Sequence, residues 1–358
     1  MEIRRPRTHG RAIALLPAGV ALLAGLDAAL LLLGLPAPVA APRLGELHGM
    51  LMVVGFLGTL IALERAVALR SPLGYAAPAL LGLGSLALLS PLPQTLGKLL
   101  LVDGALALVA VYAALLRRTH DDVVLVELLA ALLVVVATGL WLRVDVPWLL
   151  PWLVGFVVLT ICAERVELAR LVMPATGGRT LVLLASALVV TLVLALLWPE
   201  PGTRAVGLVV GALVVWLVRH DVARRTVRAS GLPRLSAAAL LGGYGWLLVA
   251  GVAWAARGAE RQGAAYDLVV HAVFLGFALS MVIAHAPVIL PAVLRRPLPY
   301  RPVLWAPLGL LHASLVIRVA GDLGGSRPLW QTGSVLNITA VLLFVVVAAV
   351  SVAAGSRP

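Results

Sequence analysis

The chain has 358 residues, of which 62% are hydrophobic and 12% are charged, and its formal net charge is +12. A soluble domain is about 45–50% apolar and about a quarter charged, so this composition excludes a water-soluble enzyme, a disordered scaffold and a nucleic-acid-binding protein. It predicts an all-α polytopic membrane protein. We expect residues 1–358 to form a single integral membrane domain surrounded by membrane lipid.

Hydropathy along the chain predicts twelve transmembrane helices, because a span needs about 20 apolar residues to cross the hydrocarbon. In chain order the predicted ranges are 11–34, 46–69, 74–90, 96–116, 122–142, 147–169, 180–198, 204–219, 236–256, 265–291, 302–320 and 332–354. They leave only short loops. An even number of spans places both termini on the same side of the membrane.

The distribution of basic residues agrees with this topology. If the N-terminus is cytoplasmic, 20 of the 28 Lys and Arg residues fall on the cytoplasmic side, as the positive-inside rule requires. These residues are Arg4, Arg5, Arg7, Arg11, Arg65, Arg70, Arg117, Arg118, Arg165, Arg170, Arg179, Arg219, Arg224, Arg225, Arg228, Arg234, Arg295, Arg296, Arg301 and Arg357. We therefore expect a multi-pass protein of the cell's inner (plasma) membrane with both termini in the cytoplasm.

An internal repeat predicts that the spans form three units of four helices. The second span carries a Gly-Phe pair followed by a Glu-Arg pair, and the sixth span repeats both pairs 100 positions later, at Gly55, Phe56, Glu64 and Arg65 and at Gly155, Phe156, Glu164 and Arg165. In the tenth span, Gly276 and Phe277 precede His285, which takes the position of the two glutamates. The predicted units cover approximately residues 11–116, 122–219 and 236–354.

Four of the seven histidines lie within predicted spans, where a polar side chain is costly and often functional. His48 in the second span and His271 in the tenth lie at comparable depth near the outer ends of two helices that run in the same direction. Two helices that each offer one neutral imidazole at one level can hold a haem iron from its two faces. The alternative for each histidine is a hydrogen bond between helices.

Arg318 lies near the outer end of the eleventh span, at the depth where the propionates of such a haem would emerge. A guanidinium forms bidentate hydrogen bonds with a carboxylate, so Arg318 is a candidate propionate ligand. The alternative is an ion pair with Asp322, one helical turn away.

A second set of polar residues lies toward the cytoplasm. His285 follows His271 by 14 residues, which places it about 21 Å deeper and nearly on the same helical face. If the three units pack around one axis, His285 meets Glu64 and Glu164 as ligands for copper or another divalent metal, or as a proton relay. His312 would approach His285 and add a ligand, or form only a buried hydrogen bond. The alternative is that both glutamates pair with neighbouring arginines.

Two spans resemble helices of known haem proteins. The stretch from Leu47-His48-Gly49 to Gly55-Phe56 resembles the second helix of the haem-copper oxidase catalytic subunit, whose histidine binds the low-spin haem. The stretch from His271 to Gly276 and Ser280-Met281 resembles the tenth helix, which supplies the opposite axial histidine. In those oxidases, a further histidine that binds the second haem occupies the position of Val269 in this chain. The copper ligands would come from residues 147–198, but this stretch contains no histidine. An oxygen-reducing centre therefore cannot be carried over.

The chain is similar above all to the NnrS family of haem- and copper-associated membrane proteins, which are linked to nitric oxide metabolism. The similarity lies in the histidine-led second span and in the run from His271 through Arg295-Arg296-Pro297-Leu298 to His312 and Arg318. It implies one bis-histidine haem b with a redox or nitric-oxide-related role, and a quinol or a small redox protein as partner.

Two other functions remain open at this point. The first is a secondary transporter or metal-ion permease that uses Glu64, Glu164 and His285 as its site. The second is a structural or assembly subunit in which the histidines only join helices.

Overall fold

A computed structural model describes residues 13–41, 43–170, 172–294 and 298–355, and its regular elements are all helices. In chain order they are α2 (Leu16–Leu32), α3 (Leu44–Met50), η1 (Leu51–Gly58), α4 (Thr59–Leu69), η2 (Pro72–Tyr75), α5 (Ala76–Leu89), α6 (Gln94–Thr119), α7 (Asp122–Leu140), α8 (Val146–Leu168), α9 (Gly177–Leu197), α10 (Pro199–His220), α11 (Ala223–Thr226), α12 (Gly231–Arg257), α13 (Gly263–His271), η3 (Ala272–Leu279), α14 (Ser280–Leu294), η4 (Pro302–Leu304), α15 (Trp305–Leu323) and α16 (Arg327–Gly355). The all-helical polytopic fold is confirmed.

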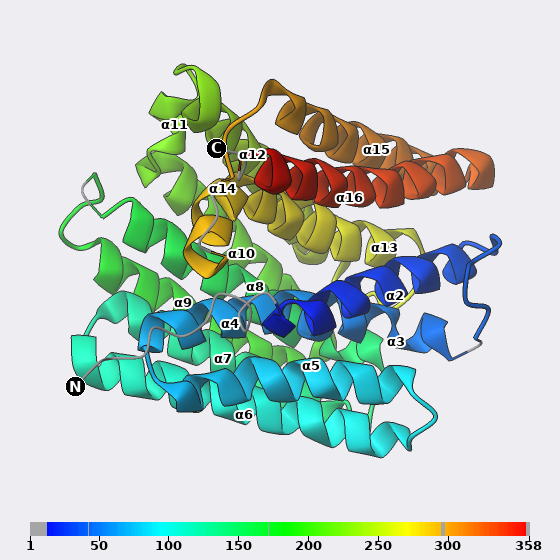
Figure 1. Cartoon of the computed structure of the whole chain (residues 1–358), viewed down its shortest axis with the longest axis horizontal. Helices are drawn as coiled ribbons and strands as arrows, with labels where there is room; N and C mark the ends of the chain where they lie inside the picture. The colour runs from blue at the N-terminus through cyan, green and yellow to red at the C-terminus, as the bar shows by residue number, and fades with distance from the viewer. Residues whose placement is uncertain (1–12, 42, 171, 295–297, 356–358) are drawn as a thin grey trace.

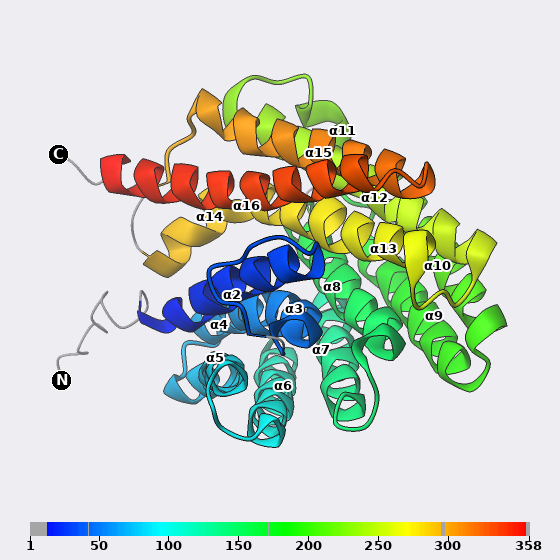
Figure 2. The same cartoon turned by 90° about the vertical axis from the view of Figure 1, so that its right-hand side faces the viewer.

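Each predicted span coincides with one helix or one continuous run of helical segments. Within the described residues, eleven helices are long and apolar enough to cross a membrane, and α2 is a shorter apolar helix of 17 residues. The start of α2 and the end of α16 lie on the same side of the molecule in Figure 2, and in Figure 1 both point toward the left. Part of the charge count lies outside the described residues, namely Arg4, Arg5, Arg7, Arg11, Arg295, Arg296 and Arg357.

Helices adjacent in the sequence pack side by side, as the short loops require. The pairs α5–α6, α7–α8, α9–α10 and α15–α16 are in contact along their lengths (Figure 2). Small residues allow the closest approaches. At Gly207 on α10, an added Cβ would lie 2.4 Å from the carbonyl oxygen of Gly251 on α12, so a larger side chain cannot enter this crossing without moving the helices apart.

The three spans that share the sequence repeat form the centre of the bundle. They are the run α3–η1–α4, the helix α8 and the run α13–η3–α14, and each contacts the other two. They are also the most buried of the long apolar spans, with 56%, 78% and 72% of their apolar windows inside the protein. Figure 2 shows α3, α8 and α13 surrounded by the remaining helices. Residues on these three spans are therefore brought together in the interior.

Two of the central spans contain a π-helix at corresponding positions. The segments η1 and η3 are each eight residues long and begin 221 positions apart, at Leu51 and Ala272. The same offset relates Gly55 to Gly276. Segments of π-helix are rare and are frequently found at functional sites. Here they begin directly after the turns that carry the two candidate haem ligands.

Candidate functional site

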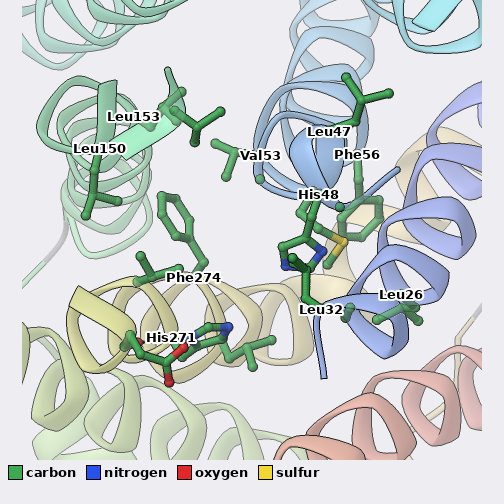
Figure 3. A pocket seen from close by; sticks show the side chains of 18 of the residues that line it. Leu26, Leu32, Leu47, His48, Val53, Phe56, Leu150, Leu153, His271 and Phe274 are labelled. Carbon is green, nitrogen blue, oxygen red and sulfur yellow. Dashed lines mark hydrogen bonds and ion pairs between the residues drawn. The ribbon is translucent and has the colours of Figure 1, made fainter. Parts of the chain in front are cut away.

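A cavity of about 700 Å³ lies between the central spans and the helices at the two ends of the chain. Its walls come from α2, α3, η1, α8, α13, η3 and α16, and α6 and α15 add polar side chains. Cavities of about 300–1,000 Å³ accommodate cofactors and other small molecules. Figure 3 shows side chains from several of these helices directed into this space.

The cavity has a polar end and an apolar end. Its polar lining groups stand near the helix ends that meet at one face of the bundle and include Glu46, Gln94, Lys98, Asp145, Asp267 and Arg318. Farther along the same helices the lining is apolar, with Phe56, Leu57, Leu279 and Val341 among it. This arrangement suits a ligand with a large apolar body and a polar edge.

His48 on α3 lines the cavity with its ring held by a neighbouring helix. Its Nδ1 lies 2.8 Å from the carbonyl oxygen of Gly25 on α2. A carbonyl oxygen can only accept a hydrogen bond, so Nδ1 carries the hydrogen and donates it. The Nε2 lone pair of the neutral ring is therefore available for a metal.

His271 on α13 has the same tautomer for the same reason. Its Nδ1 lies 2.9 Å from the main-chain oxygen of Asp267 and 3.2 Å from the Oδ1 atom of that residue. Histidines that bind metals usually donate the other ring hydrogen to a carbonyl or a carboxylate. Figure 3 shows His48 and His271 directed into the cavity from different helices. The structure therefore brings the two predicted ligands to one space.

Arg318 lies at the polar end of the cavity, and its carboxylate partner in the protein is Asp267. Its Nε and Nη2 atoms donate to the two oxygens of Asp267, at 2.8 and 2.7 Å. Of the two predicted partners, Asp322 does not make this bidentate contact, and the haem propionate stays a prediction. Sequence spacing on one helix suggested Asp322, whereas packing places α13 alongside α15. Arg318 thus orients the carboxylate that contacts His271.

Two polar residues of the cavity were not singled out as site residues by the sequence. Asp267 precedes His271 by four residues, and this helical spacing is the signal that would have indicated a contact. Lys98 is the only lysine of the chain. Its Nζ donates to the Trp141 carbonyl at 3.0 Å and lies 4.4 Å from the centre of the Trp141 ring. Lys98 adds a second positive charge to the lining of the polar end, which also contains Arg318.

Comparison with known families gives one match. Residues 11–353 match the model of a family described as a domain of unknown function, DUF8744. The chain belongs to the DUF8744 family. No curated protein and no solved structure matches it. The likeness of this DUF8744 protein to the NnrS family and the haem-copper oxidases therefore rests on the motif residues, of which Arg295, Arg296 and Pro297 lie outside the described residues.

Glu64 and Glu164 of the DUF8744 protein come together around Arg65 in a group that we call the Arg65 cluster. Its members are Glu64 and Arg65 on α4, Tyr112 on α6, Glu127 on α7, and Glu164 and Glu167 on α8. The guanidinium lies 2.8 Å from Glu64 and 3.7 Å from Glu164. Of the two predicted arrangements, the pairing of both glutamates with a neighbouring arginine is the one observed.

His285 belongs to a different network. Its Nε2 lies 3.1 Å from Nη1 of Arg165, and its Nδ1 lies 2.8 Å from the Met281 carbonyl. Arg165 also donates to both oxygens of Asp221, at 3.0 and 2.9 Å, and the Tyr244 hydroxyl donates to Asp221 at 2.6 Å. Both ring nitrogens of His285 are therefore occupied, and the residue joins α14 to α8 instead of meeting the two glutamates.

His312 forms the buried hydrogen bond that was the simpler of its two predicted roles. Its Nδ1 accepts from Trp246 at 2.9 Å, and its Nε2 lies 3.4 Å from the Ser280 hydroxyl. In the described part of this DUF8744 protein, no three His, Cys, Asp or Glu side chains are grouped as a metal site requires. The four residues expected to bind a second metal therefore lie in three separate groups of contacts, with Glu64 and Glu164 in one, His285 in another and His312 in the third.

Proposed function

We propose that this protein is an integral membrane haem protein with a redox role, in which His48 and His271 bind one haem b from opposite faces. The proposal rests on the equivalent hydrogen bonding of the two imidazoles. Each ring donates its Nδ1 hydrogen to a main-chain carbonyl and lines the same cavity. Two Nε2 lone pairs from separate helices are the donor set of a bis-histidine haem.

The remaining cavity residues fit this cofactor. The apolar walls match a porphyrin ring and exclude water from it. At the polar end, Lys98 and Arg318 supply positive charge for the propionates, although two of the guanidinium nitrogens are already bonded to Asp267. When bound, the haem supplies one-electron chemistry, and the chain's own residues set ligand orientation and charge. With cytoplasmic termini, the polar end faces the outer side, where a quinol or a small redox protein would exchange electrons.

An optical spectrum of the purified full-length protein, supplied with haem, tests the proposal. We expect the Soret band of a six-coordinate low-spin haem. The substitutions His48→Ala and His271→Ala each remove one ligand, so each should abolish the band or convert it to that of a five-coordinate haem. His312→Ala is the matched control, because His312 is a membrane histidine outside the cavity, and it should leave the spectrum unchanged. A folded protein that binds no haem refutes the proposal.

The alternative function, a secondary transporter or a permease for copper or another divalent metal, receives less support. It would use Glu64, Glu164 and His285 as one site. Among the described residues, the glutamates contact Arg65 and the histidine contacts Arg165. We therefore favour the haem proposal.

A further inference from the structure

The Arg65 cluster lies outside the cavity, far from the two candidate haem ligands, and has no part in the proposed haem site. None of its members lines the cavity. Glu64 follows His48 by 16 residues on one continuous helical run, which corresponds to about 24 Å along the axis. The cluster therefore occupies the opposite half of the bundle, where α4, α6, α7 and α8 meet.

The cluster contains more buried negative charge than its arginine can balance. Arg65 lies 2.8 Å from Glu64, 3.1 Å from Glu127 and 3.7 Å from Glu164, and these side chains are 24%, 0% and 13% exposed. Among the described residues, Arg65 is the only basic side chain within ion-pair distance of them. Three ionised carboxylates around one guanidinium leave a net buried charge of −2. Burying uncompensated charge is strongly unfavourable.

Two buried oxygens in the cluster have no hydrogen-bond partner within the part of the chain that the structure describes. One is Oε2 of Glu127, and the other is the hydroxyl of Tyr112, a fully buried side chain. The Tyr112 hydroxyl lies close enough to Arg65 and Glu127 to interact electrostatically with both. An ionised carboxylate with an unpartnered buried oxygen is costly. A proton on the carboxylate removes its charge and so lowers this cost.

A bound metal ion fits the cluster less well than a proton does. The guanidinium of Arg65 already occupies the position between the carboxylates that a cation would need. The described residues also contain no group of three side chains arranged to hold a metal.

We propose that the Arg65 cluster is a proton-binding site that exchanges protons with water at the membrane face. The bound proton is held by Glu127 or Glu164, the two more buried carboxylates, and that carboxylate becomes a carboxylic acid when the proton binds. Glu167, whose side chain is 52% exposed and lies 3.9 Å from Arg65, connects the cluster to water. The step moves one proton from water to a carboxylate, and no electrons are transferred.

Three other charged groups at this end of the bundle are bonded to partners outside the cluster. Asp121 before α7 is hydrogen-bonded to Arg170, and Arg118 on α6 donates to the main-chain oxygen of Leu69. Asp221 is bonded to Arg165. These contacts leave Tyr112 and the four glutamates as the titratable groups that face Arg65.

Infrared spectroscopy of the full-length protein in lipid nanodiscs tests this proposal, with or without haem. We expect a carbonyl stretching band of a protonated carboxylic acid at neutral pH that shifts in D2O. Glu127→Gln and Glu164→Gln should each remove or shift the band. Glu260→Gln is the matched control, because Glu260 lies in the loop between α12 and α13 and pairs with Arg257. It should leave the band unchanged.

The wild-type spectrum alone is sufficient to overturn the proposal, even if a variant fails to fold. Absence of the band at neutral pH would show that all the carboxylates are ionised. A band that does not shift in D2O would show an acid closed to water. A band that persists in both glutamine variants would belong to another carboxyl group. Metal analysis that finds one divalent metal ion bound per protein at the cluster would show that the ligand is a metal and not a proton.

Discussion

The substitution Asp267→Asn should weaken haem binding without removing an axial ligand. The carboxylate lies 3.2 Å from Nδ1 of His271 and forms two hydrogen bonds with Arg318. Loss of such a supporting partner typically lowers metal affinity by about 10–100-fold. Nδ1 also donates to the main-chain oxygen of Asp267 at 2.9 Å, a contact that asparagine retains. We therefore expect about a 10-fold loss of affinity, which corresponds to about 1.4 kcal/mol.

Titration of the haem-free protein with haem, followed by the Soret absorbance, measures this change. Glu46→Gln is the matched control, because Glu46 also lines the polar end of the cavity but neither of the two histidines is bonded to it. The control should bind haem as the wild type does. Equal affinities for Asp267→Asn and the wild type would show that the carboxylate does not support His271. An equal loss in both variants would instead indicate a general effect of negative charge.

Two further predictions concern stability. Arg165→Met leaves the buried carboxylate of Asp221 without its guanidinium partner, so it should lower the free energy of unfolding in micelles by about 3–5 kcal/mol. The control is Arg204→Met, which removes an exposed ion pair and should change the free energy of unfolding little. Partial burial alone would raise the pKa of Asp121, but a main-chain amide of α7 and Arg170 lower it below 3.8. The stabilisation from the ionised Asp121 carboxylate is complete above pH 3.8 and is lost as the pH falls through the lower pKa of the folded state. The melting temperature of Asp121→Asn should therefore fall less at acidic pH than that of the wild type.

The helices could be predicted from the sequence because the membrane imposes one requirement on each of them. A span must be long, apolar and internally hydrogen-bonded, so hydropathy alone finds it. The predicted range 147–169 compares with α8 at Val146–Leu168, and 122–142 compares with α7 at Asp122–Leu140. Larger differences occur where polar residues extend a helix beyond the apolar core, as in α12, which begins at Gly231 instead of 236.

The contacts within the site were predicted less completely, because they depend on the direction in which each side chain points around its helix axis. His48 and His271 were predicted to share one site from residue type and depth, and both line the cavity. The expectation that His285 lies on the face of His271 assumed a regular α-helix, but the π-helix η3 lies between them and changes the number of residues per turn. The alternative of an Arg318–Asp322 ion pair was wrong for a related reason, because Asp267 is close to Arg318 only after α13 and α15 pack together.

The construction of the cavity also constrains how the protein is made. Its walls combine α2 and α3, which are synthesised before the other described helices, with Arg318 on α15 and Trp330 on α16, which are synthesised after them. Domains that fold during synthesis start from their N-terminal parts, but here the compartment is incomplete until the final hairpin of α15 and α16 has inserted. A ligand of this cavity could therefore be enclosed only after α15 and α16 have inserted, and a chain that lacks these helices would present an open groove to lipid.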